Sequence, residues 1–136
     1  MQKTKTFIDS DVLIYAFRGE AELCRKAMEI LDDPEREFIV SDYLKLEILP
    51  KPIFHQFHEE VEFMQTFLDS ASFHVSATSS ITDKAIALAC RYNLSPLDAL
   101  HAGTAIESNA DVLVTGEKPE NPLCQVQEIK VISLRG

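Results

Sequence analysis

The feature that most constrains the fold of this chain is a regular alternation of short apolar runs with longer segments whose apolar residues recur at helical spacing. The short runs predict five strands, at residues 4–9, 38–41, 73–76, 112–115 and 131–134. The longer segments predict helices at residues 12–17, 20–31, 41–49, 54–71, 81–92 and 95–108. Strands that alternate with helices form a mostly parallel sheet covered on both faces. We therefore expect an α/β fold of three layers, α/β/α, with about five strands in a mostly parallel sheet.

Two helices in the middle of the chain carry specific expectations. Ser41 or Asp42 can cap the helix that follows the second strand, and Pro50 and Pro52 are expected to end it. Residues 54–71 predict one long amphipathic helix. Its apolar face is expected to pack in the core by default, with a dimer interface or a partner-binding surface as the alternative.

Length and composition limit the class of protein. A chain of 136 residues without repeats or linkers predicts one domain, residues 1–136. No apolar run approaches the roughly 20 residues that cross a bilayer, and the first residues lack a secretory pattern, so we expect a cytoplasmic protein without a membrane partner. Three widely spaced cysteines, Cys24, Cys90 and Cys124, indicate reduced thiols without a functional role.

Acidic side chains follow the first predicted strand. Parallel sheets bind ligands beyond the carboxyl ends of their strands, and Asp9 ends this strand, with Asp11 two residues later. Residues two apart in extended chain point to the same side, and Mg²⁺ and Mn²⁺ prefer oxygen ligands. The pair therefore predicts a cation site. The alternative is that Asp11 caps a helix beginning at Val12 while Asp9 merely ends the strand.

Glu47 is an acid on an apolar helix face. It lies three and four residues after Leu44 and Tyr43, which share its face. Because an isolated buried charge is costly, Glu47 needs a partner, either a nearby lysine or arginine or a metal ion.

Asp98 and His101 open the helix near residue 95. The letters SPLD predict a capping box with proline at the first helical position, which could by itself explain Asp98. The following letters, ALHAGTAI, are nearly uncharged, so the helix is expected inside the protein and its acid at the mouth of a cleft. His101 lies on the same side, and a satisfied core histidine is favoured there over a ligand or a base.

Glu117 follows the fourth predicted strand. It is either a site residue or a solvated loop acid beside Lys118 and Glu120. The hydroxyl of Thr115, at the end of that strand, could orient a carboxylate or a water molecule.

These segments resemble the PIN-domain family, which includes toxins of the VapC type. The matching pieces are FIDSDVLIYAF at residues 7–17, SDYLKLEILPK at 41–51, SPLDALHAGTAI at 95–106 and ADVLVTGEK at 110–118. They occur in the family's order and span nearly the whole chain. No single piece is specific, but all four at these separations are. The family's acids match Asp9, Glu47, Asp98 and Glu117, although the last is more often Asp. The position of Asp11 is commonly Asn, Ser or Asp.

The resemblance implies Mg²⁺ or Mn²⁺ at the acids and hydrolysis of RNA phosphodiester bonds by metal-activated water. Asp9 and Asp98 are then direct ligands, Glu47 and Glu117 hold or orient water on the metal, and Asp11 faces it. Ser10 and Thr115 are implied as supporting residues. An RNA substrate, an antitoxin protein and a homodimer are the implied partners. The candidates for phosphate contacts are Lys45, Lys51 and Lys118.

The net charge of −9 limits how such a protein grips nucleic acid. Thirteen basic residues face 22 acidic ones, whereas phosphate affinity normally comes from Lys and Arg. Two divalent cations would change −9 to −5, since −9 + 4 = −5. The balance excludes a high-affinity coating protein and permits an enzyme that holds a short stretch of RNA at a metal centre.

Two other interpretations remain open. Asp9 and Asp11 after an apolar strand also resemble the nucleophile motif of haloacid-dehalogenase-type phosphatases, with Asp9 as nucleophile, Asp11 as acid and base, and Thr115 binding phosphate. That fold expects a late acidic pair and a separate lysine, yet only Arg135 and Gly136 follow the last strand. The second alternative is a non-catalytic PIN-like binding module.

Overall fold

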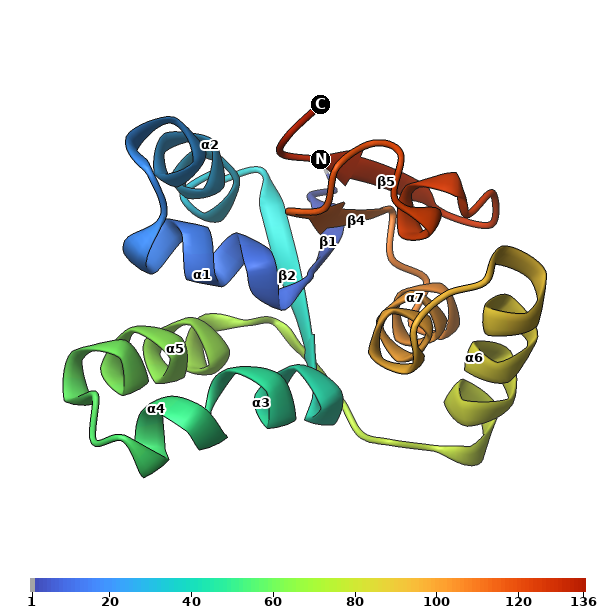
Figure 1. Ribbon diagram of the computed structural model, residues 1–136, viewed down its shortest axis with the longest axis horizontal. Helices are drawn as coiled ribbons and strands as arrows, with labels where there is room; N and C mark the ends of the chain where they lie inside the picture. The colour runs from blue at the N-terminus through green and yellow to red at the C-terminus, as the bar shows by residue number, and fades with distance from the viewer. Residues whose placement is uncertain (1) are drawn as a thin grey trace.

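Five parallel strands form the centre of the computed structural model, which describes residues 2–136 (Figure 1). The strand order is β3-β2-β1-β4-β5, and every neighbouring pair is parallel. The strands are β1 (Thr4–Ile8), β2 (Arg36–Ser41), β3 (Phe73–Val75), β4 (Val112–Thr115) and β5 (Lys130–Ser133). The order reverses direction at β1, so the carboxyl ends of β1 and β4 define the crevice where ligands bind in such sheets. The expected sheet is confirmed.

Helices cover both faces of the sheet. The helices are α1 (Ser10–Arg18), α2 (Ala21–Leu31), α3 (Asp42–Ile48), α4 (Pro50–Phe54), α5 (His58–Ser70), α6 (Ser79–Tyr92) and α7 (Pro96–Glu107), with a 3-10 turn, η1, at Pro122–Gln125. Successive residues of a strand point to opposite faces, so Phe7 packs with α6 and α7 whereas Ile8 packs with α1, α3 and α5. The two apolar clusters lie on opposite sides of the sheet, which confirms the three layers.

Several boundaries differ from those expected. The helix predicted at residues 54–71 begins only at His58, because Gln56 has a left-handed backbone with φ 57°. Pro50 and Pro52 do not simply end a helix: Pro50 is the first residue of α4, where the missing N–H is harmless. Helix α1 begins at Ser10 rather than at Val12, since Asp9 caps it.

No helix within residues 2–136 combines the length and apolar character that crossing a membrane requires.

Candidate metal centre

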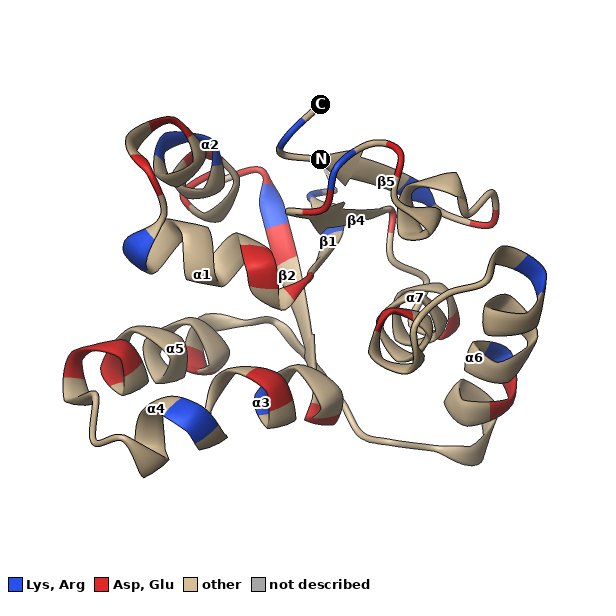
Figure 2. Cartoon of the chain, viewed as in Figure 1, with Lys and Arg blue, Asp and Glu red and all other residues tan. Residues whose placement is uncertain are grey.

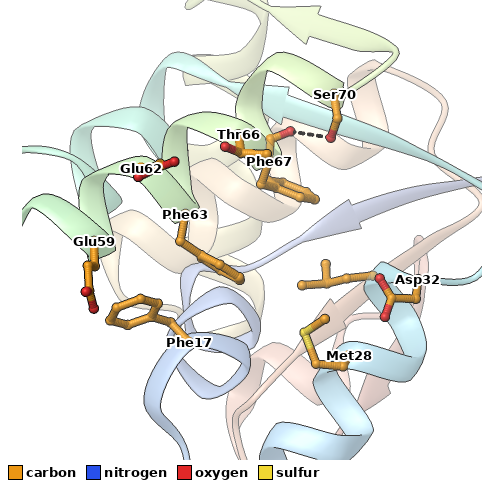
Figure 3. A pocket seen from close by; sticks show the side chains of 10 residues that line it. Phe17, Met28, Asp32, Glu59, Glu62, Phe63, Thr66, Phe67 and Ser70 are labelled. Atoms are coloured by element: carbon orange, nitrogen blue, oxygen red, sulfur yellow. Dashed lines mark hydrogen bonds between the residues drawn. The ribbon is translucent and has the colours of Figure 1, made fainter.

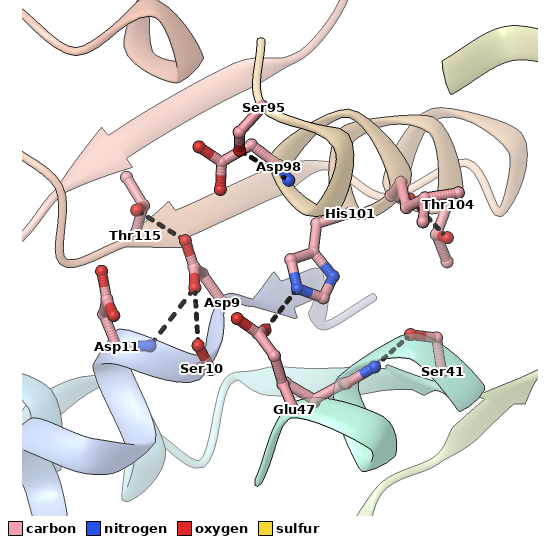
Figure 4. Close-up of polar contacts among 12 residues, drawn as sticks. Asp9, Ser10, Asp11, Ser41, Glu47, Ser95, Asp98, His101, Thr104 and Thr115 are labelled. Carbon is pink, nitrogen blue, oxygen red and sulfur yellow. Dashed lines mark hydrogen bonds and ion pairs between the residues drawn. The ribbon is translucent and has the colours of Figure 1, made fainter. Parts of the chain in front are cut away.

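Asp9 is fixed in place by four hydrogen bonds at the carboxyl end of β1. Its backbone N–H donates to Val114 O across the sheet at 3.0 Å, which places it beside the end of β4. One carboxylate oxygen, Oδ1, accepts from the N–H of Asp11 at 3.2 Å and from the hydroxyl of Ser10 at 3.3 Å. The other, Oδ2, accepts from the hydroxyl of Thr115 at 2.9 Å (Figure 4). The carboxylate is therefore oriented from both the start of α1 and the end of β4, and Asp9 is only 3% exposed.

Glu47 reaches the same place from α3 and meets a histidine there. Its Oε1 lies 2.6 Å from Nε2 of His101 on α7. The alternative of a salt bridge to a lysine or arginine is wrong among the described residues, where the partner of Glu47 is His101. Ligand atoms of Asp9, Glu47 and His101 all lie within 4.8 Å of one another. Three segments far apart in the sequence thus bring two carboxylates and an imidazole together (Figure 4).

Asp11 lies in the first turn of α1, beside this group. The alternative in which Asp11 caps the helix is wrong, because Asp9 is the N-cap and accepts from the N–H of Asp11. Burial raises the pKa of the Asp11 carboxyl to about 7, and the charges of four other acids add to the rise: Asp9, Glu117, Glu47 and Asp98. All the acids expected at the site therefore share one electrostatic environment.

Asp98 is placed by the start of α7. Ser95 is the N-cap, and its hydroxyl accepts from the N–H of Asp98 at 3.4 Å, with Pro96 as the first helical residue. Among the hydrogen bonds of the described residues, the carboxylate of Asp98 does not return a bond to the N–H of Ser95, so the capping box is only half formed. Burial raises the pKa of the Asp98 carboxyl, and the charges of Asp9 and Glu117 raise it further. The side chain sits on the same side as Asp9 (Figure 4).

Glu117 is held in the loop after β4. Its N–H donates to the hydroxyl of Thr115 at 3.1 Å, and its Oε2 accepts from the side chain of Asn121 at 3.1 Å. Thr115 therefore bridges Glu117 and Asp9. The structure does not bring Glu117, Asp11 or Asp98 into the tight group of Asp9, Glu47 and His101, although the charge of Glu117 acts on Asp11 and Asp98.

The cluster carries negative charge without basic side chains to balance it. Among the described residues, the ion pairs with Lys or Arg involve acids elsewhere, namely Glu22, Glu29, Asp33, Glu60 and Glu128. Figure 2 shows acidic segments at the start of α1, on α3 and on α7, around the ends of the strands. Buried carboxylates without counter-ions are costly, and oxygen-rich groups of this kind bind hard divalent cations. The residues present therefore fit a Mg²⁺ or Mn²⁺ ion.

The three candidate lysines and the three cysteines are not part of the acid cluster. Lys51 and Lys118 are exposed and Lys45 is half-buried. All three cysteines are free thiols. Burial raises the pKa of the Cys124 thiol, and the neighbouring charge of Glu117 raises it further, which disfavours the thiolate form.

A separate apolar groove lies between α1, α2 and α5 (Figure 3). It has a volume of about 450 Å³, and the side chains of Phe17, Met28 and Phe63 point into it. Asp32, from the end of α2, and Glu62, from α5, lie among its lining residues. None of the acids of the metal centre lines this groove.

His101 is the site residue that reasoning from the sequence undervalued. It is a core histidine, 1% exposed, with its ring 5.5 Å from that of Phe7. It is also part of the tight group, which the sequence reasoning did not favour. The available signal was its spacing: His101 is one helical turn after Asp98 and shares its side of α7.

Comparisons with known proteins agree with this geometry. A model of the PIN-domain family matches residues 6–119. A chain of a toxin–antitoxin complex from Klebsiella pneumoniae is similar, with a TM-score of 0.70 and 18% identity over 95% of this chain and 97% of that one. So is a chain of VapBC2 from Rickettsia felis bound to a DNA fragment from their promoter, with a TM-score of 0.72 and 13% identity over 96% and 98%. No curated protein sequence matches the chain. At these identities the two structures show a shared fold.

Proposed function

The chain belongs to the PIN-domain family of nucleases, and on that premise we propose that it is a metal-dependent endoribonuclease that hydrolyses RNA phosphodiester bonds. The observation that carries the proposal is the convergence of Asp9 and Glu47 within 4.8 Å, in a cluster of acids that no Lys or Arg pairs among the described residues. Such a group is suited to a cation and poorly suited to any purely structural purpose.

Asp9 and Asp98 are the proposed direct ligands of Mg²⁺ or Mn²⁺. Glu47 and Glu117, with longer side chains, hold or orient water, and Asp11 faces the same ion. When bound, the cation supplies Lewis acidity, which lowers the pKa of water and offsets negative charge that develops on the phosphoryl oxygens. A hard cation with oxygen ligands is the class that these carboxylates favour.

Neighbouring hydroxyl groups hold the acids of the site in position. Thr115 donates to Asp9 and accepts from the N–H of Glu117, so one hydroxyl sets the positions of two acids. Ser10 donates to the other oxygen of Asp9. With both of its oxygens engaged, Asp9 is held in one orientation before any cation binds, which reduces the entropy lost on binding.

We propose that the protein binds RNA weakly and over a short stretch of the substrate. Bound cations offset part of the net charge of −9, and Lys45, Lys51 and Lys118 remain the candidates for contacts with phosphate. Few basic contacts predict a shallow dependence of binding on monovalent salt, because few counter-ions are released from the RNA.

Cleavage of a mixed RNA panel with added Mn²⁺ tests the proposal. The wild type should cleave RNA, EDTA should abolish cleavage, and Asp9→Asn and Asp98→Asn should each lower the rate by at least about a hundredfold, since metal placement supplies much of the catalysis. Asp83→Asn, which alters an exposed acid on α6, is the matched control and should cleave like the wild type. Equal activity in wild type, Asp9→Asn and Asp98→Asn would sink the mechanism.

The two alternatives give different results. The family match removes the reason for the haloacid-dehalogenase interpretation, and a phosphoaspartate trapped on Asp9 would restore it. A non-catalytic binding module would show no cleavage. Titration with Mn²⁺ then reports on the site itself, because binding to the folded state alone stabilises it by RT ln(1 + [L]/Kd).

We also propose an antitoxin protein as a partner. Both similar solved structures are of toxin–antitoxin assemblies, which supports this class. The groove in Figure 3 suits a segment with apolar and basic side chains, because its floor is aromatic and Asp32 and Glu62 carry negative charge along it. On coexpression with the protein encoded by the adjacent gene, the wild type should co-purify with it, and Phe63→Glu should not. Ile86→Glu on α6 is the control. Equal co-purification of the two variants would contradict this location.

A further inference from the structure

His101 holds an unusual position for a buried histidine. It lies in the middle of α7, is 1% exposed, and contacts the cluster through Nε2, which is 2.6 Å from Oε1 of Glu47. Its other ring nitrogen, Nδ1, is buried and has no hydrogen-bond partner among residues 2–136. Nε2 is therefore hydrogen-bonded to Glu47, and Nδ1 is unpaired among the described residues.

The two neutral tautomers of His101 differ sharply in how they fit this environment. With the proton on Nε2, the ring donates to the Glu47 carboxylate, and Nδ1 is a buried acceptor without a donor. With the proton on Nδ1, a buried N–H has no acceptor, and the Nε2 lone pair faces a carboxylate oxygen at 2.6 Å. The first arrangement satisfies the charged partner and leaves one neutral acceptor unpaired, whereas the second leaves a donor unpaired and sets a lone pair against a carboxylate, so the first is the favourable one.

Glu47 depends on this contact more than Asp9 depends on any one of its own. The Asp9 carboxylate accepts bonds from Ser10, Asp11 and Thr115. Among the hydrogen bonds of the described residues, the Glu47 carboxylate makes the one with His101. Its side chain is 27% exposed and extends from α3, a helix of seven residues. Without His101, a long flexible side chain would have to be ordered by the cation alone.

We propose that His101 is a positioning residue, which donates from Nε2 to Oε1 of Glu47 and aims that carboxylate at Asp9 without binding the cation itself. Histidines that bind a metal almost always donate their second N–H to a partner, and Nδ1 of His101 has no such partner among the described residues. The inference rests on the proposed metal site and adds a residue through which α7 sets the position of Glu47, the carboxylate on α3 that is proposed to hold or orient water on the cation.

A pair of variants separates the hydrogen bond from the packing. In His101→Gln, the side-chain amide keeps an N–H donor at about the reach of Nε2, whereas His101→Leu fills similar space without a donor. Mn²⁺ affinity is read from the electron paramagnetic resonance signal of the free ion, and metal-free thermal unfolding reports folding. We expect His101→Gln to bind within about threefold of the wild type and His101→Leu to bind about tenfold more weakly or worse. Combining His101→Leu with Glu47→Gln should add little to the loss caused by Glu47→Gln alone.

Two spectroscopic measurements on the wild type do not depend on how the variants fold. In the metal-free protein, ¹⁵N chemical shifts of the ring should show the proton on Nε2. In the Mn²⁺ complex, electron spin echo modulation should lack the ¹⁴N coupling of a directly bound imidazole.

Each contrary result has one meaning. A bound-imidazole signal that vanishes in His101→Gln would make His101 a ligand and overturn the proposal. A proton on Nδ1 would overturn it too, as would wild-type affinity in a folded His101→Leu. Failure of the wild type to bind Mn²⁺ would overturn both this inference and the proposed metal site. Binding without RNA cleavage would overturn only the proposed function.

Discussion

At the scale of single residues, Asp11 is the acid of the cluster whose pKa departs most from its ordinary value. Burial and the surrounding carboxylates raise its pKa from 3.8 to about 7. An acid with a higher pKa in the folded state than in the unfolded state binds more protons when folded. Its contribution to stability is therefore present at low pH and is lost as the pH rises between these two values.

We expect the metal-free protein to lose this stability between about pH 4 and about pH 7, and Asp11→Asn to lose less. The amide cannot ionise, so the variant removes the part of the slope that belongs to Asp11, while Asp98, with its raised pKa, keeps its own part. Urea unfolding in EDTA at several pH values measures the slope. Asp83→Asn should retain the wild-type slope. An unchanged slope in Asp11→Asn would contradict the assignment.

Asp9 and His101 show what the sequence can and cannot predict at this scale. Position after an apolar strand sufficed to single out Asp9. It could not tell which of Asp9 and Asp11 caps α1, because either carboxylate suits an N-cap and the choice depends on where the first helical turn begins. The contact of His101 with Glu47 joins residues 54 positions apart, and only the packing of α7 against α3 creates it.

At the scale of elements, Gly116 allows the loop after β4 to lie close to α1. A Cβ atom on Gly116 would collide with the ring of Tyr15 and would lie 2.6 Å from Cβ of Asp11. Real side chains do not approach so closely, so any larger residue forces α1 and the loop apart. The glycine thus fixes the separation of Asp11 from the strand end that carries Thr115 and Glu117.

Gly116→Ala should destabilise the protein by about 1–3 kcal/mol, the usual cost of overpacking, and should weaken Mn²⁺ binding because Asp11 is displaced. Thermal unfolding and Mn²⁺ titration measure the two effects. Gly103→Ala is the matched control, since its Cβ would press on α6, with Ile81 O at 3.2 Å. It should change stability without changing Mn²⁺ affinity. Wild-type Mn²⁺ affinity in Gly116→Ala would show that the close approach does not serve the site.

The strands and helices around the site were predicted correctly from the pattern of apolar residues, but one break between two helices was not. All five strands and the helices flanking the site follow from the alternation of apolar residues. The break at residues 55–57 was missed, because apolar residues run through it without a change of period and Gln56 adopts a left-handed backbone that glutamine does not signal. The same break leaves Phe57 52% exposed, although it lies inside the helix predicted at residues 54–71.

At the scale of the whole molecule, composition gave the net charge but not its arrangement. A charge of −9 says only that acids outnumber bases. Placing the acids after strands predicted that some would gather, because the strand ends of a parallel sheet share one edge. The structure adds that four acids elsewhere, Glu22, Glu29, Glu60 and Glu128, are paired with arginines, whereas the acids gathered at that edge have no Lys or Arg partner among the described residues.

An exposed apolar surface on α3, α4 and the start of α5 supports the expected homodimer. It consists of Leu46, Ile53, Phe54 and Phe57, which are 52–81% exposed. Large apolar side chains exposed on neighbouring elements often mark a contact surface, and we expect a second copy of the chain to cover these four. Phe54 is the most exposed, at 81%, and it ends α4, so replacing it disturbs little of the fold.

We expect the wild type to be dimeric at micromolar concentration and Phe54→Ser to shift it to monomer, since interface aromatic residues often contribute 2 kcal/mol or more, on the order of a thirtyfold change in dissociation constant. Light scattering coupled to size-exclusion chromatography, over a dilution series, measures the mass. Ile86→Ser is the control, because Ile86 is 59% exposed on α6, away from this surface. A wild type that stays monomeric at high concentration would refute the dimer. A dimer equally stable in Phe54→Ser would refute its location, because the contact would then have to lie on another face of the molecule.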